Sequence, residues 1–333
     1  MSELPVSELP EEFVDRLQEI LPAERIEQVM ATFVQPKDVS FRVNTLLTDV
    51  ESVLKEVEQL GVNYRAVGWC PEAFSAGPER RQQLVDSDAF RDGRIYIQNL
   101  SSLLPVLLLD PQPEQAILDL AAAPGGKTLH LAARMQNRGR LAAVEVVRAR
   151  YYKMCQNLRT GGASMVRTFL KDGRVVGNKT PEQFDRVLLD APCSSEARFR
   201  LERPESWQYW GPRKIREQAR KQNGLLKSAV RALKPGGRLC YCTCSFAPEE
   251  NEVVVDRLLR REDSIELVPV ELPPELAADS VQPGLVQWRG RSLSQQLLHA
   301  RRILPSAQMS GFFLCLIEKS APLRPAPWRK KRR

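Results

Sequence analysis

The stretch Leu118-Asp-Leu-Ala-Ala-Ala-Pro-Gly-Gly-Lys-Thr128 decides the fold prediction, because it places a strand, a turn of small residues and a helix start in immediate succession. Glycines and other small residues let the backbone approach a ligand closely, and the first turn of a helix offers free N–H groups with partial positive charge. The long spacer between the glycines of a P-loop is missing, and so is the Gly-X-Gly-X-X-Gly pattern of dinucleotide sites. The stretch therefore predicts a ligand-binding turn and disfavours a dinucleotide as its ligand.

The sequence around this turn alternates strands and helices. Helices are expected from about residue 127, over 148–158 and over 214–233, and this alternation is typical of a doubly wound parallel sheet in an α/β domain. An apolar run at 311–318 predicts a closing edge strand. The strands predicted for the parallel sheet are 116–120, 140–145, 164–169, 186–190 and 238–244.

The N-terminal part follows another pattern. Apolar residues at helical spacing predict two short helices over 11–32, broken at Pro22, and extended segments at 40–45 and 62–67 flank a helix at 50–60. This order indicates a small α+β module, followed by a polar loop at 76–94. We predict a boundary near Gly93, which gives an N-terminal module over 1–93, a larger domain over 94–320 and a basic, Pro-rich, disordered tail over 321–333.

Charge and hydropathy limit the class of protein. The chain has 333 residues and a formal net charge of +8, which favours a polyanionic partner because Lys and Arg neutralise phosphates and release counterions. A basic enzyme with a well-solvated surface is the alternative. No apolar run approaches the length of a membrane span, and the acidic start lacks the features of a signal peptide. We therefore expect no membrane contact and a cytoplasmic location, or a nuclear or organellar one in a eukaryote.

The seven cysteines and two histidines limit the chemistry. An odd number of cysteines, three of them alternating along one strand, disfavours a disulfide framework. A zinc site would need further ligands and paired Cys-X-X-Cys units, so we predict no metal. Only His130 and His299 could serve as the base of a Ser-His-Asp hydrolase, which disfavours that class as well.

Two cysteines follow the ends of predicted strands. Cys193 lies in Asp190-Ala-Pro-Cys-Ser194, and Cys244 lies in Tyr241-Cys-Thr-Cys-Ser245 after a Lys-Pro-Gly-Gly turn. Ligands bind outside the carboxyl ends of the strands in open α/β sheets, so both thiols should open into one crevice. Two thiols and a carboxylate there suit covalent addition to an electron-poor ring. Cys240 and Cys242 are expected to be small buried strand residues.

Acidic residues follow two other strands. Glu145 ends the second predicted strand, where Rossmann-like sites place an acid that accepts hydrogen bonds from a ribose diol. Asp172 follows the third strand and could accept from the amino group of adenine. Acids are also common in such loops without any ligand. Together with the small-residue turn, however, the two acids favour a bound adenosine.

At this point the motifs resemble the Sun (RsmB-like) family of S-adenosylmethionine-dependent RNA cytosine-C5 methyltransferases. The resemblance covers most of the chain. It is carried by Ala121-Ala-Ala-Pro-Gly-Gly-Lys127, Asp190-Ala-Pro-Cys-Ser194, Tyr241-Cys-Thr-Cys-Ser245 with Glu249-Glu-Asn-Glu252, Phe41-Arg-Val-Asn-Thr45, Gln98-Asn-Leu-Ser-Ser102, Arg302-Ile-Leu-Pro305 and Gly311-Phe-Phe313.

The resemblance implies a class I methyltransferase domain, with a Rossmann-like doubly wound sheet and a small N-terminal RRM-like domain that binds RNA. It implies that Cys244 attacks C6 of cytosine, that Cys193 assists loss of the C5 proton and release of the RNA, and that Asp190 contacts the N3 edge. The implied cofactor is S-adenosylmethionine. Its predicted binding residues are Ala121, Ala122, Ala123, Pro124, Gly125, Gly126, Lys127, Glu145, Arg150, Asp172 and Asp190.

The chain departs from the family pattern after the release cysteine. The family often has Cys-Ser-Gly-X-Gly, whereas Cys193 is followed by Ser194-Ser-Glu-Ala-Arg198, which leaves the geometry of this loop open. Ala121 stands where the family often has Cys. One rival is a DNA cytosine methyltransferase, in which Cys193 would be the attacking thiol. A rival of another class is an inactive ribosome-assembly factor that keeps the fold.

The RNA partner is predicted only broadly. The stretch Asp172-Gly-Arg-Val-Val-Gly177 resembles bacterial members that act on small-subunit ribosomal RNA, so we expect rRNA first and tRNA second, bound by a monomer. Trp207, Tyr209 and Trp210 lie among basic residues that include Arg198 and Arg203. These aromatic residues could stack on an extruded base or could anchor the loop to the core.

Overall fold

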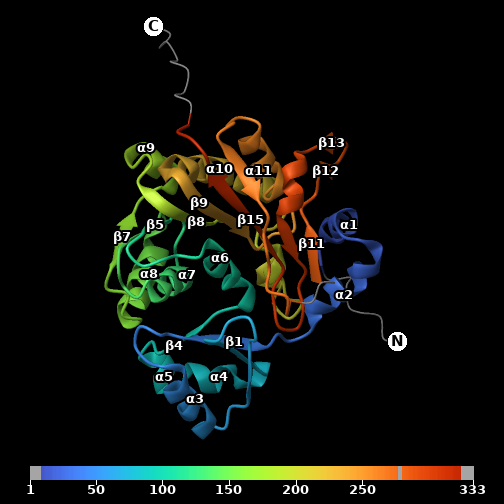
Figure 1. Ribbon diagram of the computed structural model, residues 1–333. Helices are drawn as coiled ribbons and strands as arrows, with labels where there is room; N and C mark the ends of the chain where they lie inside the picture. The colour runs from blue at the N-terminus through green and yellow to red at the C-terminus, as the bar shows by residue number, and fades with distance from the viewer. Residues whose placement is uncertain (1–8, 277–279, 324–333) are drawn as a thin grey trace.

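The chain has two main β-sheets (Figure 1), and each has its own hydrophobic core. A third, two-stranded sheet pairs β12 (Gln287–Trp288) with β13 (Arg291–Ser292). The computed structural model describes residues 9–276 and 280–323. The predicted tail therefore lies outside the described residues from position 324 onward.

The larger sheet has nine strands in the described part, in the order β11-β14-β15-β9-β8-β5-β6-β7 with β10 beside β15. The strands β5 to β9 run parallel, and β15 runs antiparallel to β9. This confirms the predicted doubly wound sheet. The strands are β5 (Ala116–Asp119), β6 (Arg140–Glu145), β7 (Val166–Leu170), β8 (Phe184–Asp190), β9 (Leu233–Thr243), β10 (Ile265–Val268), β11 (Val281–Pro283), β14 (Arg301–Ile303) and β15 (Phe312–Lys319).

The prediction of a closing edge strand at 311–318 is wrong. The strand β15 pairs with β9 on one side, and on the other side it pairs with β14 and β10. Its residues are buried almost throughout, which explains the continuous apolar run. The strands that cover it are only a few residues long, so their sequences gave no periodic signal.

Helices cover both faces of the larger sheet (Figure 1). On one side α6 contacts α7, which contacts α8; on the other α10 contacts α9 and α11. The buried residues of α10 recur at helical spacing, from Ile215 and Ala219 to Leu226 and Ala229. None of the helices in the described ranges is long and apolar enough to cross a membrane. The helices are α6 (Leu104–Leu109), α7 (Gly126–Arg134), α8 (Arg148–Thr160), α9 (Val176–Lys179), α10 (Pro212–Ala232) and α11 (Glu252–Leu259).

The smaller sheet has the strand order β2-β3-β1-β4. Its elements follow the β-α-β-β-α-β order of ferredoxin-like modules, which agrees with the RRM-like prediction. The predicted loop at 76–94 is wrong, because this segment holds short helices whose polar sequences resemble a loop. The predicted boundary at Gly93 falls inside the sheet, since β4 pairs with β1. The elements are β1 (Val39–Val43), α3 (Val50–Gln59), β2 (Tyr64–Ala66), β3 (Ala73–Ala76), α4 (Arg81–Val85), α5 (Asp88–Arg91) and β4 (Ile95–Ile97).

The first two helices, α1 (Glu11–Ile20) and α2 (Ala23–Val34), do not belong to the smaller core. The ring of Phe13 lies 4.9 Å from that of Phe199 and 5.4 Å from that of Trp210, measured between centroids. The residues of 11–34 therefore add to the larger core, although the sequence placed them in the N-terminal module.

The smaller sheet docks on α7 through the face that points away from α3. Alternate residues of β1 point to opposite faces, so Phe41 joins the core with α3 while Arg42 is buried on the docking face. Tyr96 of β4 lies against Gly126, the first residue of α7. RRM domains stack bases on the open face of their sheet. Here that face is covered, so any RNA contact of this module uses another surface.

The contact between Tyr96 and Gly126 gives a test of this docking. A Cβ atom on Gly126 would lie 2.6 Å from Cε1 of the Tyr96 ring. We expect Gly126→Ala to lower the free energy of unfolding by about 1–3 kcal/mol, the usual cost of overpacking a well-packed site. The same change in a Tyr96→Ala background should cost clearly less. Chemical denaturation measures both, with Gly211→Ala as the control because a Cβ there meets nothing within 4 Å. Equal costs in the two backgrounds would contradict the docking contact.

Candidate functional site

The site begins where β8 and β9 end. These parallel strands pair in a register that sets Asp190 opposite Cys242. The chain leaving β8 carries Cys193 and the chain leaving β9 carries Cys244, and the two Sγ atoms lie 3.4 Å apart. The structure thus brings together the two thiols that the sequence placed in one crevice.

The pKa values of the two thiols are shifted in opposite directions. The hydrogen bond from Cys193 and then the positive charge of Arg198 lower the pKa of Cys244 to about 6, although burial opposes this. The same hydrogen bond, together with burial, raises the pKa of Cys193 well above its usual range. The hydrogen bond therefore favours the proton on Cys193 and the thiolate on Cys244. A thiolate is the nucleophilic form of cysteine.

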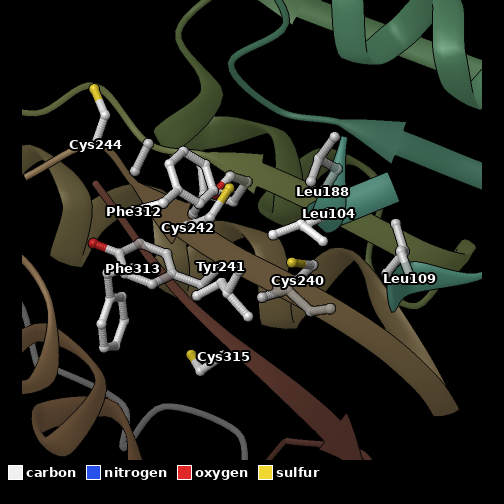
Figure 2. Close-up of a cluster of buried hydrophobic side chains, with 14 of the residues drawn as sticks. Leu104, Leu109, Leu188, Cys240, Tyr241, Cys242, Cys244, Phe312, Phe313 and Cys315 are labelled. Carbon is white, nitrogen blue, oxygen red and sulfur yellow. Dashed lines mark hydrogen bonds between the residues drawn. The ribbon is translucent and has the colours of Figure 1, made fainter. Parts of the chain in front are cut away.

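The other cysteines of β9 are core residues, as predicted. Cys240 and Cys242 are fully buried, and so is Cys315 on the neighbouring strand β15. Figure 2 shows them along the strands among apolar side chains, whereas Cys244 lies at the end of β9. Across residues 9–276 and 280–323, no three His, Cys, Asp or Glu side chains are grouped so that they could hold a metal ion.

Asp190 connects the end of β8 to the predicted cofactor turn. Its Oδ2 atom accepts a hydrogen bond of 2.7 Å from Nζ of Lys127, and its Oδ1 atom lies 3.7 Å from the Sγ of Cys242. Burial is the largest effect and opposes the charge of Lys127, but the charge of Asp190, the neighbouring Cys242 and the hydrogen bond to Asp190 together raise the pKa of Lys127. A charged lysine and a carboxylate therefore lie between the turn and the ends of β8 and β9.

The turn itself is held by its neighbours. Residues 120–125 connect β5 to α7, and Gly125 adopts a left-handed φ of 103° as the N-cap of the helix. Arg150 donates to the carbonyl of Ala123 at 2.7 Å, and Asn157 donates to that of Pro124 at 2.8 Å. The predicted residues Ala121, Ala122, Ala123, Pro124, Gly125, Gly126 and Lys127 form this turn and the helix start.

The two glycines are required for reasons other than the predicted one. A Cβ on Gly125 would face Met154 and Leu158 of α8 at 3.4 and 3.5 Å, and a Cβ on Gly126 would strike Tyr96. The left-handed backbone explains the first glycine and the docking of the smaller sheet explains the second. Close approach to a ligand is not needed to account for either.

Glu145 is buried and oriented at the end of β6. Its Oε1 atom accepts hydrogen bonds from the backbone N–H groups of Val146 and Val147, at 2.9 and 2.8 Å. Its Oε2 atom lies 3.5 Å from Nη1 of Arg150. The backbone thus fixes one oxygen and leaves the other to face Arg150.

The carboxylate of Asp172 is paired with a neighbouring arginine. Its carboxylate caps the turn at 173–175 and forms an ion pair of 2.5 Å with Arg174, which lowers the pKa of the aspartate. Arg174 therefore occupies the carboxylate oxygens of Asp172 that we predicted to accept from adenine.

Asp119 was missed as a site residue. It is buried at the end of β5, and its Oδ2 atom accepts a hydrogen bond of 2.7 Å from Thr128. Its Oδ1 atom has no hydrogen-bond partner among the described residues. Burial, followed by the charge of Asp190, raises the pKa of Asp119 to about 7. The signal in the sequence was its place as the last residue of β5, directly before the turn.

The aromatic and basic residues after Cys193 differ in their surroundings. The rings of Trp207 and Trp210 lie 6.0 and 6.3 Å from that of Phe199, so both tryptophans anchor the loop to the core. Tyr209 is 80% exposed. Arg198, one of the basic residues of this stretch, lies close enough to Cys244 for its charge to lower the pKa of that thiol.

The loop that departs from the family pattern has a defined shape. Ser195 adopts a left-handed φ of 62°, a conformation that glycine takes without cost. This is the position where the family often has glycine. The departure therefore keeps the turn and adds a hydroxyl group beside the thiols.

Comparisons with known proteins match both parts of the chain. A family model described as 16S rRNA methyltransferase RsmB/F matches residues 106–318, and one described as the N-terminal domain of 16S rRNA methyltransferase RsmF matches residues 9–100. Ribosomal RNA small subunit methyltransferase F of Cronobacter sakazakii is 36% identical over 96% of this chain, and that of Pectobacterium carotovorum is 34% identical over 98%. The chain spans 65% and 66% of the length of these two relatives.

A solved structure agrees over the whole fold. A methyltransferase homolog protein from Pyrococcus horikoshii is 32% identical, with a TM-score of 0.80, and the alignment covers 96% of this chain and all of that one. It supports the class I methyltransferase fold that the motifs predicted. Because one family model covers more than half of its length, the chain belongs to the 16S rRNA methyltransferase RsmB/F family.

Proposed function

We propose that this protein transfers a methyl group from S-adenosylmethionine to C5 of a cytosine in small-subunit ribosomal RNA, through a covalent adduct between Cys244 and C6. The observation that carries the proposal is the pair of thiols 3.4 Å apart at the ends of β8 and β9. Asp190, which ends β8 shortly before Cys193, is hydrogen-bonded to Lys127 at the start of the helix that follows the turn after β5. The names of the relatives support the choice of RNA.

The residues around the turn suit S-adenosylmethionine. The start of α7 offers backbone N–H groups, Glu145 presents an oriented carboxylate for a ribose diol, and the unpaired Oδ1 of Asp119 suits a cationic amino group. When bound, S-adenosylmethionine would supply a methyl group on a positively charged sulfur, and breaking of that carbon–sulfur bond would leave a neutral thioether as the second product. Arg150 and Asn157 hold the turn in shape for it.

Cys244 begins the reaction. Its thiolate forms a bond from Sγ to C6 of cytosine, and the electron pair of the C5–C6 double bond shifts toward C5 and the N3 edge of the ring. The pair of Lys127 and Asp190 at this end of β8 supplies a positive charge and a proton that balance this shift. C5 thereby becomes nucleophilic and takes the methyl group.

Cys193 completes the reaction. Once Cys244 is bonded to carbon its negative charge disappears, and with it the main cause of the raised pKa of Cys193. Cys193 can then release its proton to solvent and accept the proton from C5. Loss of that proton restores the C5–C6 double bond and expels Cys244 as the thiolate, which frees the RNA.

The proposal is tested by methyl transfer from labelled S-adenosylmethionine to small ribosomal subunits, free small-subunit RNA, tRNA and duplex DNA. We expect 5-methylcytosine in small-subunit RNA, and we expect Cys244→Ala to abolish it. Cys155→Ser is the control, because this partly exposed thiol lies in α8, where its Sγ donates to the hydroxyl of Thr168 at 3.5 Å. Transfer to tRNA alone would show that the substrate is tRNA and not small-subunit RNA. No transfer to any RNA would favour the inactive assembly factor.

Cofactor binding is tested separately by calorimetry. Glu145→Ala should weaken the affinity for S-adenosylmethionine by roughly 10- to 100-fold, as expected for the loss of hydrogen bonds to a charged group. Asp172→Ala should have a smaller effect, because Arg174 already pairs with that carboxylate. Circular dichroism checks that both variants are folded. A larger loss in Asp172→Ala than in Glu145→Ala would reverse the two assignments.

A further inference from the structure

Two buried carboxylates tie together the loops that carry the thiols. We call residues 191–198 the first thiol loop and residues 244–251 the second thiol loop. Glu196 lies in the first loop and Glu250 in the second, and their side chains are 2% and 0% exposed. Neither takes part in the reaction steps above, and each side chain bonds to the opposite loop.

Glu196 reaches from the first loop to the second. Its Oε2 atom accepts hydrogen bonds from the hydroxyl of Ser245 at 3.0 Å, the N–H of Phe246 at 2.7 Å and the N–H of Ala247 at 2.9 Å. Its Oε1 atom accepts from Nε1 of Trp210 at 2.9 Å. These four partners are all donors, so this side chain must accept at both oxygens.

Glu250 reaches back from the second loop to the first. Its Oε1 atom accepts from the N–H of Ser194 at 3.0 Å, and its Oε2 atom accepts from the hydroxyl of Ser194 at 2.6 Å. That hydroxyl also lies 3.0 Å from the hydroxyl of Ser245, midway between the loops. A backbone hydrogen bond also joins the two loops, because the N–H of Ala197 donates to the carbonyl of Cys244 at 3.1 Å.

We propose that Glu196 and Glu250 are positioning residues that cross-link the two thiol loops and so hold the Sγ atoms of Cys193 and Cys244 at hydrogen-bonding distance. The inference rests on the proposed roles of the two thiols and deepens them. Each residue adjoining a thiol, Ser194 and Ser245, is held by a carboxylate from the other loop. Loss of either carboxylate leaves buried donors unpaired and lets the loops separate.

The two carboxylates differ in what can replace them. Burial, followed by the charge of Glu196, raises the pKa of Glu250 to about 8, which favours the neutral acid at neutral pH. In this form the contact of 2.6 Å between Oε2 and the Ser194 hydroxyl is kept, with the acid proton of Glu250 donated to the serine oxygen. Glutamine has the same shape and is also neutral, and its amide can accept from the N–H of Ser194 and donate to the serine hydroxyl. At Glu196, a glutamine amide group would have to face at least one donor with its own N–H groups.

The pKa of Cys244 depends on the distance between the Sγ atoms of the two thiols. The groups that face this thiol are Cys193, Asp190, Arg198 and Ser195, and among them the hydrogen bond from Cys193 is the largest cause of its lowered pKa. If the loops separate, this hydrogen bond lengthens and the thiolate loses its stabilisation. The pKa of Cys244 should then rise.

The experiment measures the rate at which iodoacetamide alkylates Cys244 as a function of pH, followed by mass spectrometry of the peptide that contains it. The wild-type rate should rise with a midpoint at about pH 6. Glu250→Ala should move the midpoint up by roughly one pH unit or more, as expected for the loss of a hydrogen bond to a charged group. Glu250→Gln should keep the wild-type midpoint, and Glu196→Gln should raise it.

Glu249→Gln is the matched control. Glu249 is the preceding residue in the same motif, but it is 26% exposed and pairs with Arg16 at 2.6 Å instead of the thiol loops. In Glu249→Gln, the midpoint for alkylation of Cys244 should equal the wild-type midpoint. A wild-type midpoint in Glu250→Ala, or equal shifts in Glu250→Gln and Glu250→Ala, would overturn the positioning role. The assay needs no RNA or cofactor, so its result is independent of whether methyl transfer is observed.

Discussion

The parallel pairing of β8 with β9 is the constraint on which the site depends. Its register places Asp190 beside Cys242, so the two strands end side by side and the chains that leave them run next to each other. Only this arrangement allows thiols from two distant parts of the sequence to meet at 3.4 Å. The pairing is buried beneath helices on both faces, which makes the strand ends a rigid base for the loops.

The remaining features extend from that base in two directions. Toward the cofactor turn, Lys127 joins Asp190, and the turn is supported from behind by Arg150, Asn157 and the docked ring of Tyr96. Toward the second thiol loop, buried polar contacts hold the residues of the Glu-Glu-Asn-Glu motif. Glu252, for example, forms an ion pair of 2.5 Å with the buried Arg302. These motifs thus lie far apart in sequence but support one small region.

The sequence predicted the parts of this account that depend on local pattern. The strands β5, β6, β8 and β9 each contain an apolar run, and both thiols follow strand ends, so their meeting could be foreseen. What depends on distant contacts was missed. The need for glycine at Gly126 comes from Tyr96 in another sheet, and the burial of Glu196 and Glu250 comes from the opposite thiol loop. A carboxylate in a polar loop resembles a solvated surface residue until its partners are placed.

The most direct test is to identify which sulfur bonds to the base. The protein would be incubated with S-adenosylmethionine and small-subunit RNA that contains 5-fluorocytidine, whose fluorine cannot leave as a proton does, so elimination stalls and the adduct persists. Digestion and mass spectrometry then locate the attached nucleotide. The account predicts attachment at Cys244, with Cys193 unmodified. Attachment at Cys193 would contradict it and would indicate the mechanism of DNA cytosine methyltransferases.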